Sequence, residues 1–211
     1  EKRLEAVRHL TSLGINTAIR LDPLFIHLFQ ALYVESWFKE IEQVITAFAG
    51  TGAKHIVCST GRLSKKAAHP GYADGSIWER VRRVIQDHSS NAARSFESEY
   101  IYERGGTSQG YLLRKELRLD FHHRLKVLVE ANGMTYATCQ ELSAEESDSM
   151  GIAHCQRFIL PFSRKQSDGR FKAIDGCTAN CHINCRRLEH PPCGQPELTA
   201  SGPFKISALK K

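Results

Sequence analysis

The stretch that decides the fold is residues 37–60, WFKEIEQVITAFAGTGAKHIVCST, because it predicts a helix followed directly by a buried strand. Its first half carries apolar side chains at helical spacing, namely Phe38, Ile41, Ile45 and Phe48. Gly50 and Gly52 then end the helix, since glycine readily adopts the backbone conformations that terminate one. Residues 54–60, KHIVCST, are apolar and β-branched up to a polar end, which is typical of a buried strand.

The same unit occurs twice more in the chain. Near the start, an amphipathic helix pattern at residues 4–13 precedes an apolar strand pattern at residues 15–21. Later, the longest helix pattern, at residues 113–129, precedes a strand pattern at residues 134–139. A glycine separates helix from strand each time. The chain therefore repeats a helix, a glycine connection and a strand.

This alternation predicts an α/β fold with parallel strands joined by right-handed crossovers. It leaves two architectures open, an open doubly wound sheet and part of a parallel β/α barrel. Between the units, residues 77–85 predict a further helix, whereas residues 89–110 show no clear pattern. Composition changes after the third strand, so we expect one domain at residues 1–142 and an extension at residues 143–211.

The extension has little that could form a core. Residues 142–150 are acidic and weakly helical, residues 158–160 are strand-like, and residues 163–170 predict a basic loop. From residue 171 onward almost no periodic apolar pattern remains. Such a tail needs another source of order, and metal ligation can supply it.

Ligands of parallel α/β folds bind at the carboxyl ends of the strands. The polar residues at these ends are Arg20, Asp22, Ser59, Thr60, Cys139, Gln140 and Glu141. Arg20 and Asp22 point to the same side because side chains alternate along a strand. Ordinary turn chemistry is the alternative explanation for these residues. Cys139 is a candidate catalytic residue, as a substrate-facing thiol or a hydrogen-atom donor, although a small buried side chain is the commoner role.

Four of the seven cysteines gather in the tail, namely Cys177, Cys181, Cys185 and Cys193. The first three are four residues apart, so on a helix their sulfurs would line one face, and the two prolines before Cys193 would turn it back. Four thiolates suit either tetrahedral zinc or a cubane 4Fe-4S cluster, and the absence of paired Cys-x-x-Cys knuckles favours iron–sulfur. Buried or unpaired thiols are the alternative. A histidine could replace one ligand, the nearby ones being His154, His182 and His190.

Composition and charge limit the class of protein. The 211 residues are 41% hydrophobic and 25% charged, which is ordinary for a globular chain. No apolar run suits a spanning helix or a signal peptide, so we expect a cytoplasmic protein with no membrane contact. A formal charge of +6 and a pI near 9.0 favour an anionic partner such as nucleic acid, or a solvated basic surface. No nucleophile elbow, phosphate loop or dinucleotide turn occurs, which disfavours hydrolases and nucleotidases.

Three segments resemble radical S-adenosylmethionine proteins related to spore photoproduct lyase. They are residues 3–24, with RLEAV, GI and RLDPL, residues 52–57, GAKHIV, and residues 132–141, NGMTYATCQE. Their order and spacing match the second half of that family's partial β/α barrel over residues 1–142. The resemblance implies a partial parallel barrel with S-adenosylmethionine at the carboxyl mouth of its strands. It makes Arg20 and Asp22 candidates for polar contacts to the cofactor or substrate, and Ser59 and Glu141 at the other strand ends complete the set of cofactor-binding candidates.

The family's defining Cys-x-x-x-Cys-x-x-Cys motif, whose cluster cleaves S-adenosylmethionine to the 5′-deoxyadenosyl radical, is not in this chain. We expect an N-terminal half, lost or supplied separately, that carries this cluster. The reasons are the missing initiator methionine, the opening of the chain in a helix and the presence of only three barrel strands. The tail cysteines would then hold an auxiliary iron–sulfur cluster for electron relay or substrate ligation, and the chain alone would be inactive. Two other hypotheses stay open: a basic α/β module that binds nucleic acid and has a structural four-cysteine zinc site, and an inactive remnant.

Overall fold

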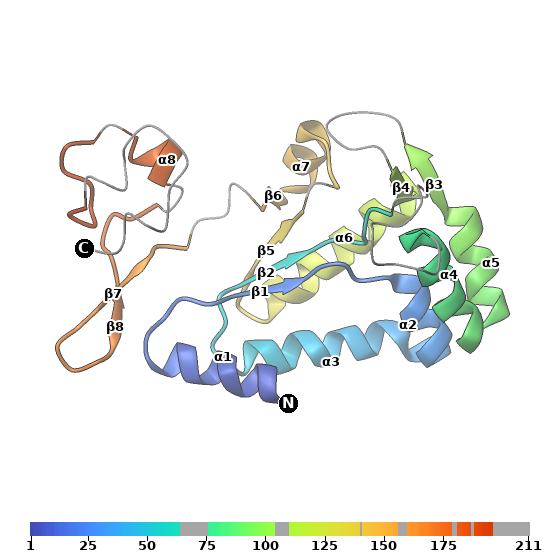
Figure 1. Cartoon of the computed structure of the whole chain (residues 1–211), viewed down its shortest axis with the longest axis horizontal. Coiled ribbons are helices and arrows are strands. Elements are labelled where there is room, and N and C mark those ends of the chain that lie inside the picture. Colours follow the sequence, from blue (N-terminus) through green and yellow to red (C-terminus); the bar gives the residue numbers. More distant parts are fainter. Residues whose placement is uncertain are drawn as a thin grey trace.

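Helices and strands alternate along most of the chain (Figure 1). The computed structural model describes residues 1–63, 76–103, 110–139, 141–155, 160–178, 181–186 and 188–195. The helices are α1 (Lys2–Ser12), α2 (Ile26–Tyr33), the 3-10 helix η1 (Val34–Ser36), α3 (Trp37–Ala49), α4 (Ile77–His88), α5 (Ser90–Glu99), α6 (Lys115–Ala131), α7 (Ala144–Met150) and α8 (Cys181–Asn184). The strands are β1 (Ala18–Leu21), β2 (His55–Cys58), β3 (Tyr100–Glu103), β4 (Gly110–Leu113), β5 (Thr135–Thr138), β6 (Ala153–His154), β7 (Ser163–Lys165) and β8 (Phe171–Ala173). None of the helices in these ranges is both long and apolar enough to cross a membrane.

The central sheet has four parallel strands in the order β1, β2, β5, β6. This confirms the expected α/β fold with parallel strands. The expectation of only three strands is wrong, because the two residues of β6 pair in parallel with Ala137 and Thr138 of β5. A strand of two residues is too short to show an apolar pattern in the sequence. It also carries the sheet past the expected domain boundary at residue 142.

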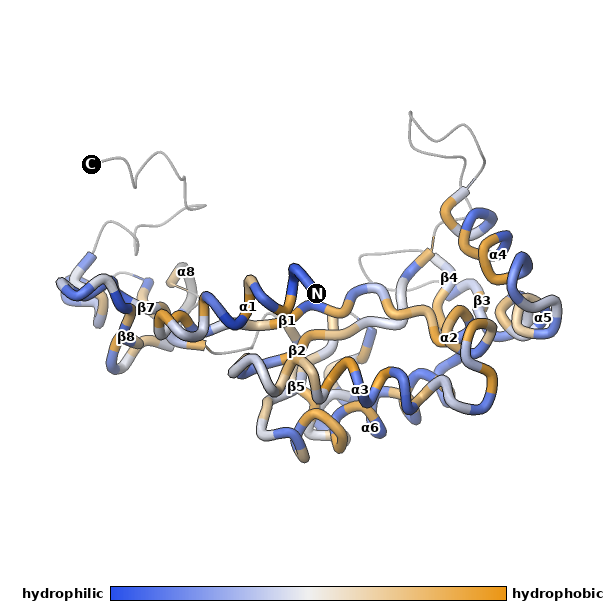
Figure 2. The backbone as a smooth tube through the Cα atoms, turned by 90° about the horizontal axis from the view of Figure 1, so that it is seen from below, coloured by the Kyte–Doolittle hydropathy of each residue, from blue (hydrophilic) through white to orange (hydrophobic). Residues whose placement is uncertain are grey.

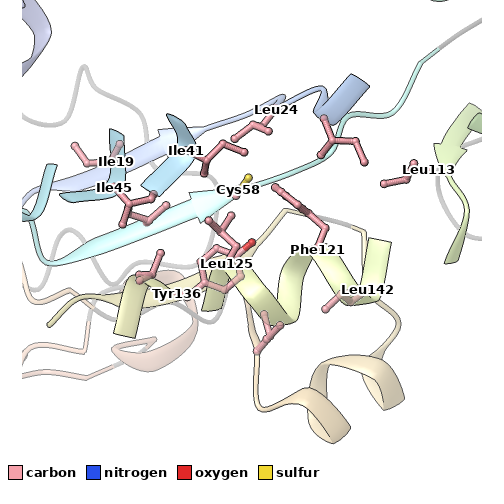
Figure 3. Close-up of a cluster of buried hydrophobic side chains, with 14 of the residues drawn as sticks. Ile19, Leu24, Ile41, Ile45, Cys58, Leu113, Phe121, Leu125, Tyr136 and Leu142 are labelled. Carbon is pink, nitrogen blue, oxygen red and sulfur yellow. The ribbon is translucent and has the colours of Figure 1, made fainter. Parts of the chain in front are cut away.

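Helices α3 and α6 cover one face of this sheet (Figure 2). Along β1, β2 and β5, alternate side chains such as Ile19, Cys58 and Tyr136 point toward these helices. Figure 3 shows them in one buried cluster with Ile45 of α3 and Leu125 of α6. Complete burial of one large aliphatic side chain stabilises a fold by about 1.5–3 kcal/mol. This layer between sheet and helices is therefore the main core.

The opposite side of the sheet, which we call the open face, carries the other half of the strand side chains. On β1, β2 and β5 they are Ala18, Arg20, His55, Val57, Thr135 and Ala137. Val57 and Ala137 in the middle of this face are buried, whereas Ala18, Arg20 and Thr135 are exposed. Parts of β1 and β5 therefore present side chains to solvent on this face.

The same buried cluster continues beside the carboxyl ends of the sheet strands, where α2, α4, α5 and the antiparallel β3–β4 pair come together (Figure 1). It buries the aromatic rings of Trp78, Phe96 and Tyr100. The described part of residues 89–110 thus forms α5, β3 and the first residue of β4. Helix α5 buries Ala92, Ala93 and Phe96, and because only Phe96 is large, the sequence shows no clear apolar stripe there. Leu113, expected to begin the long helix, is instead the last residue of β4.

The basic segment at residues 163–170 is not a loop, as expected, but forms β7 and the turn of an antiparallel hairpin with β8. Gly169 takes a positive φ of 83° in this turn, and the Arg170 N–H donates to Asp168 Oδ1 at 2.9 Å. The side chains of β7 are polar, so the sequence shows no apolar alternation that would predict this strand. Of the strand expected at residues 158–160, the first two residues lie outside the described part of the chain.

The β7–β8 hairpin docks on the end of α1. The Phe171 N–H donates to the Leu13 carbonyl oxygen at 2.6 Å, and Asn16 Nδ2 donates to the Pro161 carbonyl oxygen at 3.0 Å. Gly14 permits this approach, because a Cβ at that position would lie 2.0 Å from the Phe171 carbonyl oxygen. The tail is therefore joined to the sheet domain through main-chain contacts that require a glycine.

Candidate functional site

Polar side chains from the ends of three neighbouring strands meet on the open face. Arg20 Nε donates to Asp22 Oδ2 at 2.8 Å, and Arg20 Nη2 donates to Cys139 Sγ at 2.8 Å. The Ser59 hydroxyl donates to the other oxygen of the Asp22 carboxylate. We call Arg20, Asp22, Ser59 and Cys139 the strand-end cluster. Parallel pairing brings them together, because β1, β2 and β5 all end at the same edge of the sheet.

The strand-end cluster combines a fixed cation with a protonated thiol. Hydrogen bonding to Asp22 raises the pKa of Arg20, whose side chain is still 58% exposed. Burial and the neighbouring Cys155 raise the pKa of Cys139 to about 11, although the Arg20 charge acts in the opposite direction. Cys139 therefore keeps its hydrogen at neutral pH. Such a thiol is a poor nucleophile but retains the S–H bond that a hydrogen-atom donor needs.

Glu141 and Thr60, although next to these strand ends in sequence, do not join the strand-end cluster. The Glu141 carboxylate is buried and accepts hydrogen bonds from the N–H groups of Thr60 and Gly61 at 2.7 and 2.8 Å. The Thr60 hydroxyl also lies 3.0 Å from this carboxylate. The buried Glu141 carboxylate thus fixes the position of the loop that follows β2. Gln140 lies outside the described residues.

His122 of α6 completes this buried network and was not a sequence candidate. Its Nε2 lies 2.9 Å from Glu141 Oε2, and its Nδ1 lies 2.7 Å from the Tyr136 hydroxyl. An ionised carboxylate can only accept, so Nε2 carries the hydrogen and Nδ1 accepts from Tyr136. In the sequence His122 stands beside His123 on an amphipathic helix, and its three-residue spacing from Leu125 is the only sign that it faces inward.

Cys155 is the second residue that sequence reasoning missed. It follows β6, and its Sγ lies 3.6 Å from Cys139 Sγ at the edge of the strand-end cluster. Because β6 has only two residues, no pattern in the sequence places Cys155 next to β5. A second thiol, that of Cys155, therefore lies beside Cys139 at the edge of the strand-end cluster.

All four tail cysteines border one pocket of about 300 Å³. Helix α8 begins at Cys181, so Cys177 lies before it and Cys185 directly after it. The expectation that three cysteines share one helical face is therefore wrong for the described residues. Instead, the chain wraps around the pocket, and a turn in which the Gly194 N–H donates to the Pro191 carbonyl oxygen at 2.8 Å presents Cys193 to it.

The thiols of this cysteine pocket influence one another's charge. Burial and the three other tail cysteines raise the pKa of Cys181, and burial with two of these cysteines raises the pKa of Cys185. Four thiolates would repel one another there unless a positive group bound them. The Phe162 N–H donates to Cys177 Sγ at 3.4 Å, and Arg164 and Lys165 also line the pocket. Such donors and charges stabilise metal-bound thiolates.

The arrangement of the sulfurs bears on which metal group would fit. Within the described residues, no three His, Cys, Asp or Glu side chains are close enough to hold a single metal ion. His154 and His190 do not line the pocket, and the His182 side chain is not among those described. Among the described residues, the four tail thiols therefore border one pocket without forming a ready site for a metal ion.

Comparison with protein-family models, with curated proteins and with solved structures finds no match to this chain. Conclusions about function therefore depend on the sequence motifs and on the geometry of the strand-end cluster and the cysteine pocket.

Proposed function

We propose that this chain is the C-terminal part of a radical S-adenosylmethionine enzyme similar to spore photoproduct lyase, and that its sheet is one half of a partial β/α barrel. The observation that carries the proposal is the convergence of Arg20, Asp22, Ser59 and Cys139 on the open face. In a β/α barrel, helices surround the outside and ligands bind inside, at the carboxyl ends of the strands. The side of the sheet away from α3 and α6 corresponds to that interior.

The strand-end cluster has the chemistry that S-adenosylmethionine requires. The cofactor offers a carboxylate, an ammonium group and ribose hydroxyls. The Arg20 guanidinium, held in place by Asp22, suits a carboxylate, and the Asp22 and Ser59 oxygens suit the ammonium group or a hydroxyl. Cys139 Sγ keeps a hydrogen within the same cluster, available to a substrate bound beside the cofactor.

The cysteine pocket would hold an auxiliary 4Fe-4S cluster through Cys177, Cys181, Cys185 and Cys193. When bound, such a cluster supplies or accepts single electrons, or ligates a substrate. The Phe162 N–H stabilises negative charge on the Cys177 sulfur. The cluster that cleaves S-adenosylmethionine would be carried by a separate N-terminal half, whose strands would extend the sheet from its β1 edge and curve around the open face.

Anaerobic reconstitution of the full chain with iron and sulfide tests the cysteine pocket. We expect a broad charge-transfer absorbance band, with four irons and four sulfides bound per chain. Cys181→Ser should lose this band, whereas Cys139→Ser, outside the pocket, should keep it. One zinc ion per chain without sulfide would contradict the cluster and favour the alternative, a nucleic-acid-binding module. That module would also show binding that weakens steeply from low to physiological salt.

The assignment to the radical S-adenosylmethionine class has an independent test in the genome. Coding sequence immediately upstream, or a neighbouring gene, should contain a Cys-x-x-x-Cys-x-x-Cys motif after a predicted strand. Absence of the motif from both places would contradict the enzyme assignment while leaving the metal-binding result of the reconstitution unaffected.

A further inference from the structure

Cys139 and Cys155 occupy matching positions at the ends of two neighbouring parallel strands. The last paired residues of β5 and β6 are Thr138 and His154, and each cysteine follows one of them. The Cys155 N–H donates to the Thr138 carbonyl oxygen at 2.8 Å, which continues the ladder to the cysteines. Their sulfurs lie 3.6 Å apart. The two thiols are thus neighbours through the main chain as well as through their side chains.

This placement satisfies the geometric condition for a disulfide. Neighbouring strands of a sheet lie about 4.8 Å apart, and disulfides join Cα atoms roughly 4.4–6.8 Å apart. To reach a bonded distance of about 2.0 Å, the sulfurs must approach by about 1.5 Å, which small side-chain rotations provide. The backbone of the sheet does not need to move.

The pair is also accessible and lies beside a positive charge. Both side chains are partly exposed, in contrast to Cys58, which is fully buried in the core. Arg20 Nη2 contacts Cys139 Sγ at 2.8 Å and partly offsets the burial that raises the pKa of this thiol, so the small thiolate fraction that begins disulfide exchange lies beside a positive charge. The tail cysteines line a different pocket and do not contact this pair in the described part of the chain.

We propose that Cys139 and Cys155 form a dithiol site that reacts with small-molecule disulfides and closes to an intramolecular disulfide. One thiolate attacks a sulfur of the reagent, forming a mixed disulfide and releasing one thiolate of the reagent. The second cysteine gives up its proton and attacks the protein sulfur of the mixed disulfide, which releases the other half of the reagent. Two protein thiols and one disulfide thus give one protein disulfide and two small thiols, and two electrons pass to the reagent.

Closure would change the strand-end cluster chemically. Cys139 would lose the hydrogen that its thiol holds, which would remove the candidate hydrogen-atom donor from the strand-end cluster. The bond would also tie the end of β5 to the end of β6 across residues 140–154, which include α7. The site goes beyond the proposed enzyme function and requires neither S-adenosylmethionine nor a metal.

Peptide mapping of the full chain tests the proposal. Residues 127–157 form one tryptic peptide, because no lysine or arginine lies between Lys126 and Arg157, and this peptide contains both cysteines. After anaerobic treatment with oxidised glutathione, acid quenching and alkylation, we expect this peptide to be two hydrogens lighter and free of alkyl groups. A protease specific for glutamate cuts at Glu141, Glu145 and Glu146, between the cysteines, so its fragments should separate only after reduction.

The outcomes separate closure from simple surface reactivity. In Cys155→Ser, Cys139 should appear as a glutathione adduct or as an alkylated thiol, with no cross-linked peptide. Three results would overturn the proposal for the wild-type chain: a peptide alkylated at both cysteines at every glutathione ratio, glutathione on each cysteine without closure, or a cross-link to a tail cysteine. These three results are all measured on the wild-type chain, so a folding defect in Cys155→Ser would not affect the test. Failure here would leave the reconstitution test of the proposed function untouched.

Discussion

The buried Glu141 carboxylate joins the loop after β2 to helix α6. It accepts hydrogen bonds from the Thr60 and Gly61 N–H groups and from His122, all in the interior. Because the Thr60 loop follows Ser59 directly, the carboxylate also fixes where Ser59 meets Asp22. A residue that looks like a ligand-binding candidate in the sequence thus positions the strand-end cluster from below.

Glu141→Gln should destabilise the chain by about 2–4 kcal/mol, because an amide cannot accept all of these bonds and leaves a buried donor unpaired. Urea denaturation followed by circular dichroism measures the loss. Glu42→Gln is the matched control, since Glu42 is exposed on α3 and its change should stay within about 0.5 kcal/mol. Equal unfolding midpoints for the two variants would contradict the structural role of Glu141.

His55 gives the chain a pH dependence of stability. Burial lowers its pKa from 6.5 to about 4 in the folded state, so the folded protein holds this ring neutral. The unfolded chain takes up a proton below about pH 6.5, and this contribution is therefore lost as pH falls from there toward 4. We expect a free energy of unfolding about 1–2 kcal/mol lower at pH 5 than at pH 7 from this residue. His55→Gln should remove that part of the pH dependence. If the free energy of unfolding of this variant fell with pH as steeply as that of the wild type, His55 would not be its source.

At the scale of elements, the sequence predicts those helices and strands whose length gives a clear period. Helices α1, α3, α4 and α6 and strands β1, β2 and β5 lie where their apolar patterns indicate. The acidic segment at residues 142–150 forms α7, where Ser143 and Glu146 make a capping box. Elements with few large apolar side chains, such as α5, β6 and β7, show no apolar period in the sequence and depend on tertiary pairing. Their positions follow from contacts that are distant in sequence.

The docking of the β7–β8 hairpin on α1 depends on Gly14. Gly14→Ala should cost more than the usual penalty of about 1–2 kcal/mol for a side chain at positive φ, because the new Cβ would also collide with Phe171. Gly133→Ala is the matched control, since Gly133 has a φ of 73° but nothing within 4 Å of a Cβ. Hydrogen exchange should show faster exchange of the Phe171 amide only in Gly14→Ala. Equal exchange in both variants would mean that the hairpin docks without this contact.

At the scale of the whole molecule, two candidate sites differ in how far the sequence could predict them. Parallel pairing alone brings Arg20, Asp22 and Cys139 to one edge, so their meeting follows from the helix–strand alternation. The contact between Cys139 and Cys155 does not, because it requires a strand too short to recognise. In the tail, cysteine spacing predicts the members of the pocket but not its shape, since the chain forms turns on either side of the single-turn helix α8.

Metal loading should therefore order the tail without altering the sheet. The described residues from 171 to 195 have few buried apolar side chains, Cys185 among them, so ligand bonds to the four tail cysteines would supply most of their stability. Anaerobic loading with iron and sulfide should slow amide exchange there by about tenfold or more, equivalent to about 1.4 kcal/mol. Exchange in β1 and β2 should not change. Cys139→Ser should behave like the wild type and Cys181→Ser should show no slowing, whereas equal slowing throughout the chain would indicate non-specific metal binding.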